Sequence, residues 1–282
     1  MRYLSRPPFD VEAVVQACTN KLENGDLKER LVATQATLTQ QEKIYTDHSD
    51  SKNWSDFPRS ISAGHLTNDE MKSLYKYEMT SEKGAAYRFY SKLKNSSPHG
   101  KCPLCGIGVV SSIDHYLPKS RYTDVAITPH NLVPACNDCN KFKHTRFPRL
   151  YSEQLLHPYF DDFTEHQWIQ GEVYDNGSPV IAFKVDSNGN YSDADEARLH
   201  THFRVLRLAV VYGSNAAEQL TTDRSDLLTT YADSGALGVK KHLDEEAKRY
   251  EKKNLNSWQS VYYRTLSASD WFANEGFLGI PE

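Results

Sequence analysis

The chain has 282 residues, of which 25% are charged and 39% hydrophobic, and its formal net charge is -4. This composition is typical of a folded globular protein and excludes fibrous and intrinsically disordered classes. The first ten residues lack the apolar segment of a signal peptide, and no stretch is apolar for long enough to span a membrane. We therefore expect a cytoplasmic protein without a membrane partner.

The N-terminal part of the chain has the residue spacing of helices. Hydrophobic residues recur every three or four positions, and the sequence Thr67-Asn-Asp-Glu70 is a capping box, which marks the start of a helix. Gly25 and Asp26 predict a turn and an N-cap between the first two helices. The predicted helices cover residues 11–23, 27–45, 67–79 and 81–93, with a loop at 46–64.

After Pro148 the sequence predicts a short helix or turn, then a hairpin, then further helices. The hairpin strands flank Asn176-Gly177, a pair of residues that favours a two-residue turn. A hydrophobic stripe predicts a helix that Gly213 ends, and another stripe lies near the C-terminus. The predicted ranges are 163–170 for the turn, 173–174 and 180–185 for the strands, 195–212 for the first helix and 214–277 for the remaining helices.

Four of the five cysteines form two Cys-x-x-Cys pairs, Cys102/Cys105 and Cys136/Cys139. Two such pairs in a reducing compartment predict a tetrahedral zinc site. Four thiolate ligands would make that zinc structural, because they leave no position open for water. The fifth cysteine, Cys18, lies on the apolar stripe of the first helix, so we expect it to be buried in the core.

A carboxylate, an imidazole and an amide lie between the two cysteine pairs. Asp114 and His115 follow a predicted strand over residues 109–113, and Asn131 begins a returning extended stretch over residues 131–134. These are the side-chain types that hold a divalent ion and activate water for the hydrolysis of a phosphodiester bond. The segment is therefore a candidate active site.

A helix is predicted directly after the second strand. Over residues 137–146, Asn140 and His144 are four positions apart and share one helical face. A hairpin followed by this helix would turn Asp114 and His115 toward those two side chains. The sequence thus predicts a strand–strand–helix module closed by the cysteines.

Positive charge is concentrated around the same module. Residues 92–149 contain nine Lys or Arg and three Asp, which gives this segment a net charge of +6. Because the net charge of the whole chain is -4, the remaining residues together carry -10. A local basic region suits a polyanionic substrate, and the acidic remainder argues against a general coating of nucleic acid. A solvated lysine-rich surface without a partner is the alternative interpretation.

The order Asp-His-x-x-Pro, Asn-Leu and Cys-x-x-Cys-Asn-x-x-Lys over residues 102–144 resembles the HNH endonucleases, which have a ββα-metal core and an accessory four-cysteine zinc. The resemblance implies that His115 is the general base that takes a proton from the attacking water. It implies that Asp114 and Asn140 hold the catalytic divalent ion. Asn131 would hold the loop after His115 through hydrogen bonds to the backbone.

The asparagine at position 140 makes the sequence look like the HNN variant of this family. An amide oxygen is a harder ligand than an imidazole, so the resemblance implies Mg²⁺ or Mn²⁺ as the catalytic ion and zinc only at the cysteines. Some members of the family use a pair of ligands four residues apart on this helix, so His144 is a candidate third ligand of the catalytic ion, and the sequence leaves that assignment open. The basic residues expected to contact the nucleic acid are Lys119, Arg121, Lys141, Lys143 and Arg146.

The expected fold is α+β, mainly helical, built around a ββα-metal core that a four-cysteine zinc site closes. We expect three parts: a helical region at residues 1–97, the nuclease module at 98–150, and a hairpin with helices at 151–282. The expected function is that of a metal-dependent HNH endonuclease that hydrolyses phosphodiester bonds of DNA, with duplex DNA favoured over single strands and RNA.

Two runs outside the module resemble those of bacterial HNH proteins in Septu antiphage systems, which work with an ATPase: His157–Asp162 and the tail from Trp258 to Phe272. The chain has no Gly-x-x-x-x-Gly-Lys-Ser/Thr loop, so an ATPase would be a separate partner protein. Two alternatives stay open: a restriction-type HNH nuclease, and a zinc-dependent nucleic-acid-binding or assembly subunit without catalysis. The run at 157–162 could also be an exposed turn with Tyr159 and Phe160 buried.

Overall fold

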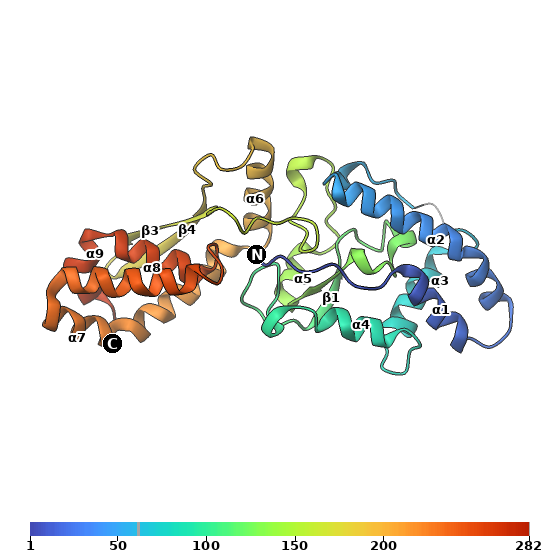
Figure 1. Ribbon diagram of the computed structural model, residues 1–282, viewed down its shortest axis with the longest axis horizontal. Helices are drawn as coiled ribbons and strands as arrows, with labels where there is room; N and C mark the ends of the chain where they lie inside the picture. Colours follow the sequence, from blue (N-terminus) through green and yellow to red (C-terminus); the bar gives the residue numbers. More distant parts are fainter. Residues whose placement is uncertain (61–62, 282) are drawn as a thin grey trace. The chain divides into compact units, whose positions relative to one another are not determined.

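The structure is a computed structural model that describes residues 1–60 and 63–281 (Figure 1). Most of the assigned elements are helices, and the strands in the described ranges form two antiparallel two-stranded sheets. The predicted α+β, mainly helical class is therefore confirmed. The chain divides into two compact units, residues 2–162 and Met1 with residues 163–282.

The three-part division at residues 1–97, 98–150 and 151–282 stays a prediction. In the structure the helical region and the nuclease module share one compact unit. Within the part of the chain that is described, no helix has both the length and the apolar character that crossing a membrane requires.

The N-terminal helices begin where the sequence supplies caps. The Asp10 carboxylate accepts a hydrogen bond from the backbone N–H of Ala13 at 2.9 Å, and the predicted capping box of Thr67 and Glu70 is present. The elements are α1 (Val11–Lys21), α2 (Asp26–Asp50), the 3-10 turn η1 (Trp54–Asp56), α3 (Asn68–Ser73), the π-helical turn η2 (Leu74–Met79) and α4 (Tyr87–Lys94).

Two boundaries in this region differ from the prediction. Helix α2 continues to Asp50, so the predicted loop at 46–64 is shorter, and its residues 61–62 lie outside the described residues. Helix α4 begins only at Tyr87, because the preceding segment folds into a turn. In that turn Gly84 lies so close to Glu78 that a Cβ atom at position 84 would be 2.2 Å from the Glu78 carbonyl oxygen.

The helices of this unit share one hydrophobic core with the strands of the module. Buried side chains of α1 to α4, among them Val14, Leu38 and Phe89, cluster with Ile113 and Leu132 of the two strands. Cys18 belongs to the same cluster and is 1% exposed, so its predicted burial is confirmed. The core therefore fixes the back of the sheet whose end carries the candidate site.

The strand–strand–helix module forms as predicted, with shifted ends. Strand β1 (Ser112–His115) pairs antiparallel with β2 (Leu132–Ala135), and α5 (Asn137–Lys143) follows directly. The connection between the strands contains the 3-10 turns η4 (Thr123–Val125) and η5 (Pro129–Asn131). Other short 3-10 turns of this unit are η3 (Pro98–Gly100) and η6 (Tyr151–Glu153).

The predicted helix over residues 137–146 is too long. Helix α5 ends at Lys143, because His144 has a φ of 51° and a ψ of -135°, which is not helical. His144 is thus the residue that ends α5, and its expected place on the same helical face as Asn140 was wrong.

The run at residues 157–162 is part of the core of this unit. His157 is fully buried, and its ring stacks on Trp54 with the ring centroids 5.3 Å apart. Tyr159 is fully buried too, and only Asp162 at the end of the run is exposed. Burial of the two aromatic residues is confirmed, whereas the exposed turn is wrong.

The unit of residues 163–282 contains the hairpin and the long helices. Its elements are β3 (Ile169–Asp175), β4 (Pro179–Val185), α6 (Asp193–Val205), α7 (Leu208–Glu251), α8 (Trp258–Ala268), α9 (Asp270–Asn274) and the 3-10 turn η7 (Gly276–Gly279). The predicted hairpin is confirmed, but residues 163–170 form no helix. Gly213 lies inside α7, and the helical break comes earlier, at Arg207, whose φ is 55°.

Candidate active site and metal centre

The four paired cysteines come together in one buried cluster. The Sγ atoms of Cys102, Cys105, Cys136 and Cys139 lie within 4.8 Å of one another. The first pair lies on the turn before β1, and the second pair flanks the start of α5, where Cys136 is the N-cap and its Sγ accepts the N–H of Cys139 at 3.5 Å. The cluster that the spacing predicted is therefore confirmed.

The geometry of this cluster fits a zinc ion. The Sγ atoms of Cys105 and Cys136 are 3.9 Å apart. Four zinc–sulfur bonds of about 2.3 Å in a tetrahedron place the sulfurs about 3.8 Å from one another. Gly108 closes the cluster from one side, since its N–H lies 3.4 Å from the Cys105 Sγ and a Cβ there would be 2.7 Å from the Cys136 Sγ.

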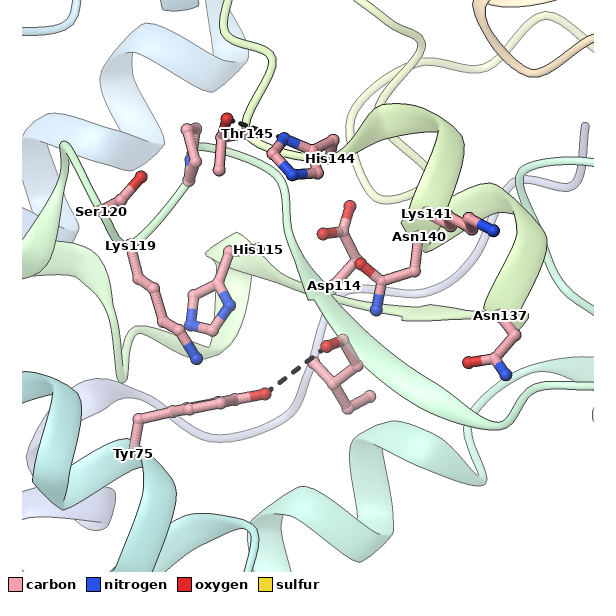
Figure 2. Close-up of a pocket in the computed structure, with 12 residues that line it drawn as sticks. Tyr75, Asp114, His115, Lys119, Ser120, Asn137, Asn140, Lys141, His144 and Thr145 are labelled. Atoms are coloured by element: carbon pink, nitrogen blue, oxygen red, sulfur yellow. Dashed lines mark hydrogen bonds between the residues drawn. The ribbon is translucent and has the colours of Figure 1, made fainter.

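On the other side of α5, an open pocket of about 460 Å³ is lined by six of the ten site residues predicted besides the cysteines (Figure 2). Asp114 and His115 reach it from the end of β1, Asn140 from α5, and His144 from the residue that ends α5. Asn131 does not line it and is fully buried. The fold thus brings the predicted base and the predicted ion ligands around one space.

His115 is fixed in a single tautomer by its surroundings. Its Nε2 lies 2.9 Å from the carbonyl oxygen of Ala126. Because a carbonyl oxygen can only accept, Nε2 carries the hydrogen and Nδ1 keeps the lone pair that a general base needs. Burial, with a smaller contribution from the ammonium of Lys119, lowers the pKa of His115 to about 3. The imidazole is therefore neutral at physiological pH.

Asn131 ties the loop that carries Ala126 to the end of β1. Its Oδ1 accepts the N–H of Leu117 at 2.7 Å, and its Nδ2 donates to the carbonyl oxygens of Leu117 at 3.0 Å and Val125 at 3.1 Å. Val125 precedes the residue that receives the His115 hydrogen bond. These are side-chain to backbone hydrogen bonds of the kind that the resemblance implied for Asn131, and they connect the end of β1 to the loop that accepts the His115 hydrogen bond.

Asp114 is buried and forms an ion pair with a lysine. The Nζ atom of Lys143 lies 3.0 Å from Asp114 Oδ2 and donates a hydrogen bond to the carbonyl oxygen of His115 at 2.5 Å. Lys143 is only 4% exposed. Burial raises the pKa of Asp114, and the Lys143 ammonium opposes that rise. Lys143 therefore lies behind the Asp114 carboxylate and not at the surface, where a contact with a phosphate was expected.

Asn140 is oriented by a serine on the neighbouring strand. Its Nδ2 donates to Ser112 Oγ at 3.0 Å, and Ser112 Oγ in turn donates to the Ala135 carbonyl oxygen at 3.5 Å. The amide nitrogen is thereby used, and the amide oxygen is the atom left for a cation. Oxygen atoms of Asp114 and Asn140 are the ligand type that Mg²⁺ and Mn²⁺ prefer, so this pocket fits such an ion. His144 is exposed, and its Nδ1 lies 2.9 Å from Thr145 Oγ1.

The pocket has a wall that comes from the N-terminal helices. The ring of Tyr75, in the π-helical turn η2, meets the His115 ring nearly edge-on, with centroids 4.4 Å apart. The ammonium of Lys119 lies over the face of Tyr75, 4.3 Å from its centroid. Tyr75 thus supports both the imidazole and one of the predicted cationic residues from below (Figure 2).

The other predicted nucleic-acid contacts are on the surface. Lys141 is exposed and lines the pocket. Arg146 is exposed in a neighbouring depression, and Arg121 is exposed with its guanidinium over the ring of Phe147. Of the five predicted cationic residues, only Lys143 is buried. The residues that motif spacing could not find are Tyr75, Ser112 and Ala126.

Comparison with known proteins agrees with this geometry. Residues 102–146 match the family model described as HNH endonuclease. The chain is also 26% identical over 293 aligned residues to "Protein ea31" of Escherichia phage lambda, and the alignment covers 96% of this chain and 99% of that protein. No solved structure matches the chain. Similarity to the phage protein thus extends far beyond the module.

Proposed function

Because residues 102–146 form an HNH endonuclease domain, we propose that the protein is a metal-dependent endonuclease that hydrolyses phosphodiester bonds of DNA. One observation carries the proposal. His115 has its Nε2 fixed on the Ala126 carbonyl oxygen and lines the same pocket as Asp114 and Asn140. A neutral imidazole whose Nδ1 lone pair is free, next to oxygen atoms that can bind a cation, is the arrangement that can accept a proton from water beside a bound phosphate.

Each residue has a separate task in the proposed reaction. His115 Nδ1 accepts the proton of the attacking water, and Asn131 keeps the imidazole in place through the loop. Asp114 and Asn140 would hold Mg²⁺ or Mn²⁺, which when bound supplies positive charge for the phosphate oxygens. Lys119 and Lys141, at the rim of the pocket, hold the substrate backbone.

Lys143 has a positioning role in this proposal. Its ammonium holds Asp114 Oδ2 and the His115 carbonyl oxygen together, so the two neighbouring residues of β1 keep one orientation. This replaces the phosphate contact expected for Lys143, because a lysine that is 4% exposed cannot reach a surface-bound strand without leaving its ion pair.

Incubation of supercoiled plasmid with the purified protein and Mg²⁺ or Mn²⁺ tests the proposal. Wild-type protein should nick or linearise the plasmid, and His115→Ala should reduce the rate by about 10² to 10⁴, the usual contribution of a general base. His130→Ala, in the same loop but outside the pocket, is the matched control and should cleave normally. Cleavage by His115→Ala at the wild-type rate would remove this residue from the mechanism.

The wider role that we propose is that of an effector nuclease in antiphage defence, controlled by a separate ATPase. Its support is the resemblance of the runs at 157–162 and 258–272 to the Septu nuclease subunits. The name of the phage relative, "Protein ea31", states no activity. An adjacent ATPase gene, and loss of phage resistance with His115→Ala, would support this role, whereas an adjacent methyltransferase gene would favour restriction. If the protein bound DNA but did not cleave it at any metal concentration, with or without an ATPase partner, the assembly subunit would be favoured.

A further inference from the structure

Three arginines converge on one phenylalanine next to the candidate active site. The guanidinium carbon of Arg121 lies 4.0 Å from the centroid of the Phe147 ring, that of Arg59 lies 5.2 Å away, and that of Arg149 lies 5.9 Å away. The arginines come from the segment after η1, from the loop after His115, and from the segment after α5. We call Arg59, Arg121, Arg149 and Phe147 the arginine platform.

The platform carries three positive charges, and the ion pairs of the described residues do not include them. All three arginines are exposed, and in the ranges 1–60 and 63–281 none of them forms an ion pair with a carboxylate. Glu153 is the acidic residue in the adjoining depression, and its Oε2 accepts the backbone N–H of Arg149 at 2.9 Å. Guanidinium groups gathered around one ring repel one another, so a bound anion would stabilise the arrangement of the three arginines.

Backbone contacts hold the platform together. The N–H of Ser60 donates to the carbonyl oxygen of Arg121 at 3.3 Å, which places Arg59 next to the loop after His115. Ser60 is tied to that loop a second time, since its Oγ donates to Asp124 Oδ1 and accepts the N–H of Asp124 at 3.3 Å. The backbone segments of Arg59 and Arg121 are therefore held next to each other, which lowers the entropy lost when the two arginines bind one ligand.

The platform continues the wall of the active-site pocket. Arg149 and Phe147 line a depression that shares His144 and Thr145 with the pocket of Asp114 and His115. Arg121 follows Lys119 and Ser120, which line the pocket from the other side. A polyanion with one phosphate in the pocket would therefore have neighbouring phosphates in reach of the platform.

We propose that the arginine platform binds the phosphodiester backbone beside the scissile bond and holds the cleaved strand in register. Guanidinium groups stacked on an aromatic ring keep their N–H edges for bidentate hydrogen bonds with phosphate oxygens. The proposal rests on the proposed nuclease function and adds Arg59, Phe147 and Arg149, all of which lie outside residues 102–146 of the HNH domain.

The test is the salt dependence of DNA binding. In the full-length His115→Ala protein, which binds without cleaving, the affinity for a labelled oligonucleotide duplex is measured between 50 and 200 mM NaCl, conditions in which counterion release dominates. Combining Arg59→Gln, Arg121→Gln and Arg149→Gln should reduce the slope of log affinity against log salt by about 0.9 per lost contact, and so by about 2.7. Phe147→Leu should weaken binding less, because the charges stay and only their support is lost.

Arg88→Gln is the matched control. Arg88 is exposed and stacks on Phe89 at 4.8 Å in the same unit, but it lines neither the pocket nor the neighbouring depression. It should leave the slope unchanged. Thermal unfolding checks that the triple variant is folded, and if it is not, Arg121→Gln alone should still lower the slope by about 0.9.

The outcomes separate the platform from the nuclease function. A folded triple variant with the same slope as His115→Ala alone would overturn the platform, and plasmid cleavage by the wild-type protein would leave the nuclease function intact. A lowered slope in the triple variant, together with a wild-type protein that never cleaves, would support the platform and count against catalysis.

Discussion

The cysteine cluster and the Asp114 pocket lie on the two sides of α5, and both have ligands for a metal ion. The cluster offers four sulfurs, and none of its cysteines is more than 6% exposed. The pocket offers carboxylate, amide and imidazole groups, and it is an open cavity of about 460 Å³. A closed sulfur site has no position for a substrate, whereas an open oxygen-rich site keeps one.

The difference shows how one short helix serves two purposes. Cys139 and Asn140 are consecutive residues of α5, so their side chains point to different sides, one to the cluster and one to the pocket. The cluster fixes the helix at its N-terminus, and the Lys143–Asp114 ion pair fixes its C-terminal turn to β1. Stability and chemistry are therefore divided between neighbouring side chains.

The largest expected effect is the loss of the cluster. Cys136→Ser removes one of four thiolates from a site whose metal-binding free energy, about 10 to 16 kcal/mol in small zinc domains, is free energy of folding. We expect a protein that has lost its zinc in elemental analysis and unfolds at a much lower temperature. Cys18→Ala, at a buried cysteine outside the cluster, should keep one zinc per chain. If elemental analysis found no zinc in the purified wild-type protein, the prediction of a structural zinc ion would be refuted.

The next largest effect should come from the buried lysine. Lys143→Met leaves Asp114 buried without its partner, which should lower the free energy of unfolding by about 3 to 5 kcal/mol. It should not change the salt dependence of DNA binding, because Lys143 is not at the surface. Denaturant unfolding and binding titrations measure the two quantities separately.

Lys141→Met, two residues away, should behave in the opposite way. Its ammonium is exposed at the rim of the pocket. The free energy of unfolding should change by less than about 0.5 kcal/mol, while the salt slope falls by about 0.9. If the two variants exchanged these signatures, Lys143 would be the phosphate contact that the motif alone suggests.

These two lysines show what the sequence can and cannot predict. The cysteines, Asp114 and His115 were found because they belong to a local hairpin and helix with fixed spacing. Lys141 and Lys143 look alike in such a pattern, since burial depends on which side of α5 faces β1. In the structure Lys143 is on the side that faces β1 and pairs with Asp114, whereas Lys141 is exposed.

The support of the site comes from distant parts of the chain. Tyr75 and Arg59 precede the module by tens of residues, and neither belongs to a pattern that signals catalysis or binding. Their roles follow only from tertiary packing, which brings η2 against His115 and the segment after η1 against Arg121. The helix end predicted at Gly213 was wrong for a related reason. Gly213 lies inside α7, because tertiary packing overrides a local stop signal.

A smaller effect should distinguish the two asparagines. Asn140→Ala should raise the Mg²⁺ concentration for half-maximal cleavage, and Asn140→His should restore activity preferentially with Mn²⁺, Ni²⁺ or Zn²⁺. Asn131→Ala should instead lower turnover at every metal concentration, because it loosens the loop of the base. A wild-type metal dependence in Asn140→Ala, together with a shift in His144→Ala, would identify His144 as the ligand in place of Asn140.

The smallest effect concerns pH, and it separates the base from the ion ligands. An exposed histidine loses its basic form below a pH of about 6.5. Burial lowers the pKa of His115 to about 3, so its Nδ1 stays unprotonated as the pH falls from 7 to 5, and this group should cause no loss of rate there. Burial raises the pKa of Asp114, so any acid limb in that range should come from the carboxylate.

Cleavage rates measured from pH 5 to 8 at two Mg²⁺ concentrations distinguish these sources. Protonation of Asp114 competes with the ion, so its limb should move to lower pH as Mg²⁺ increases. Protonation of His115 would not respond to the ion in this way, because the imidazole is not expected to be a ligand. A limb near pH 6.5 that stays in place at both concentrations would mean that the imidazole is solvated in the active enzyme, against its burial under Tyr75.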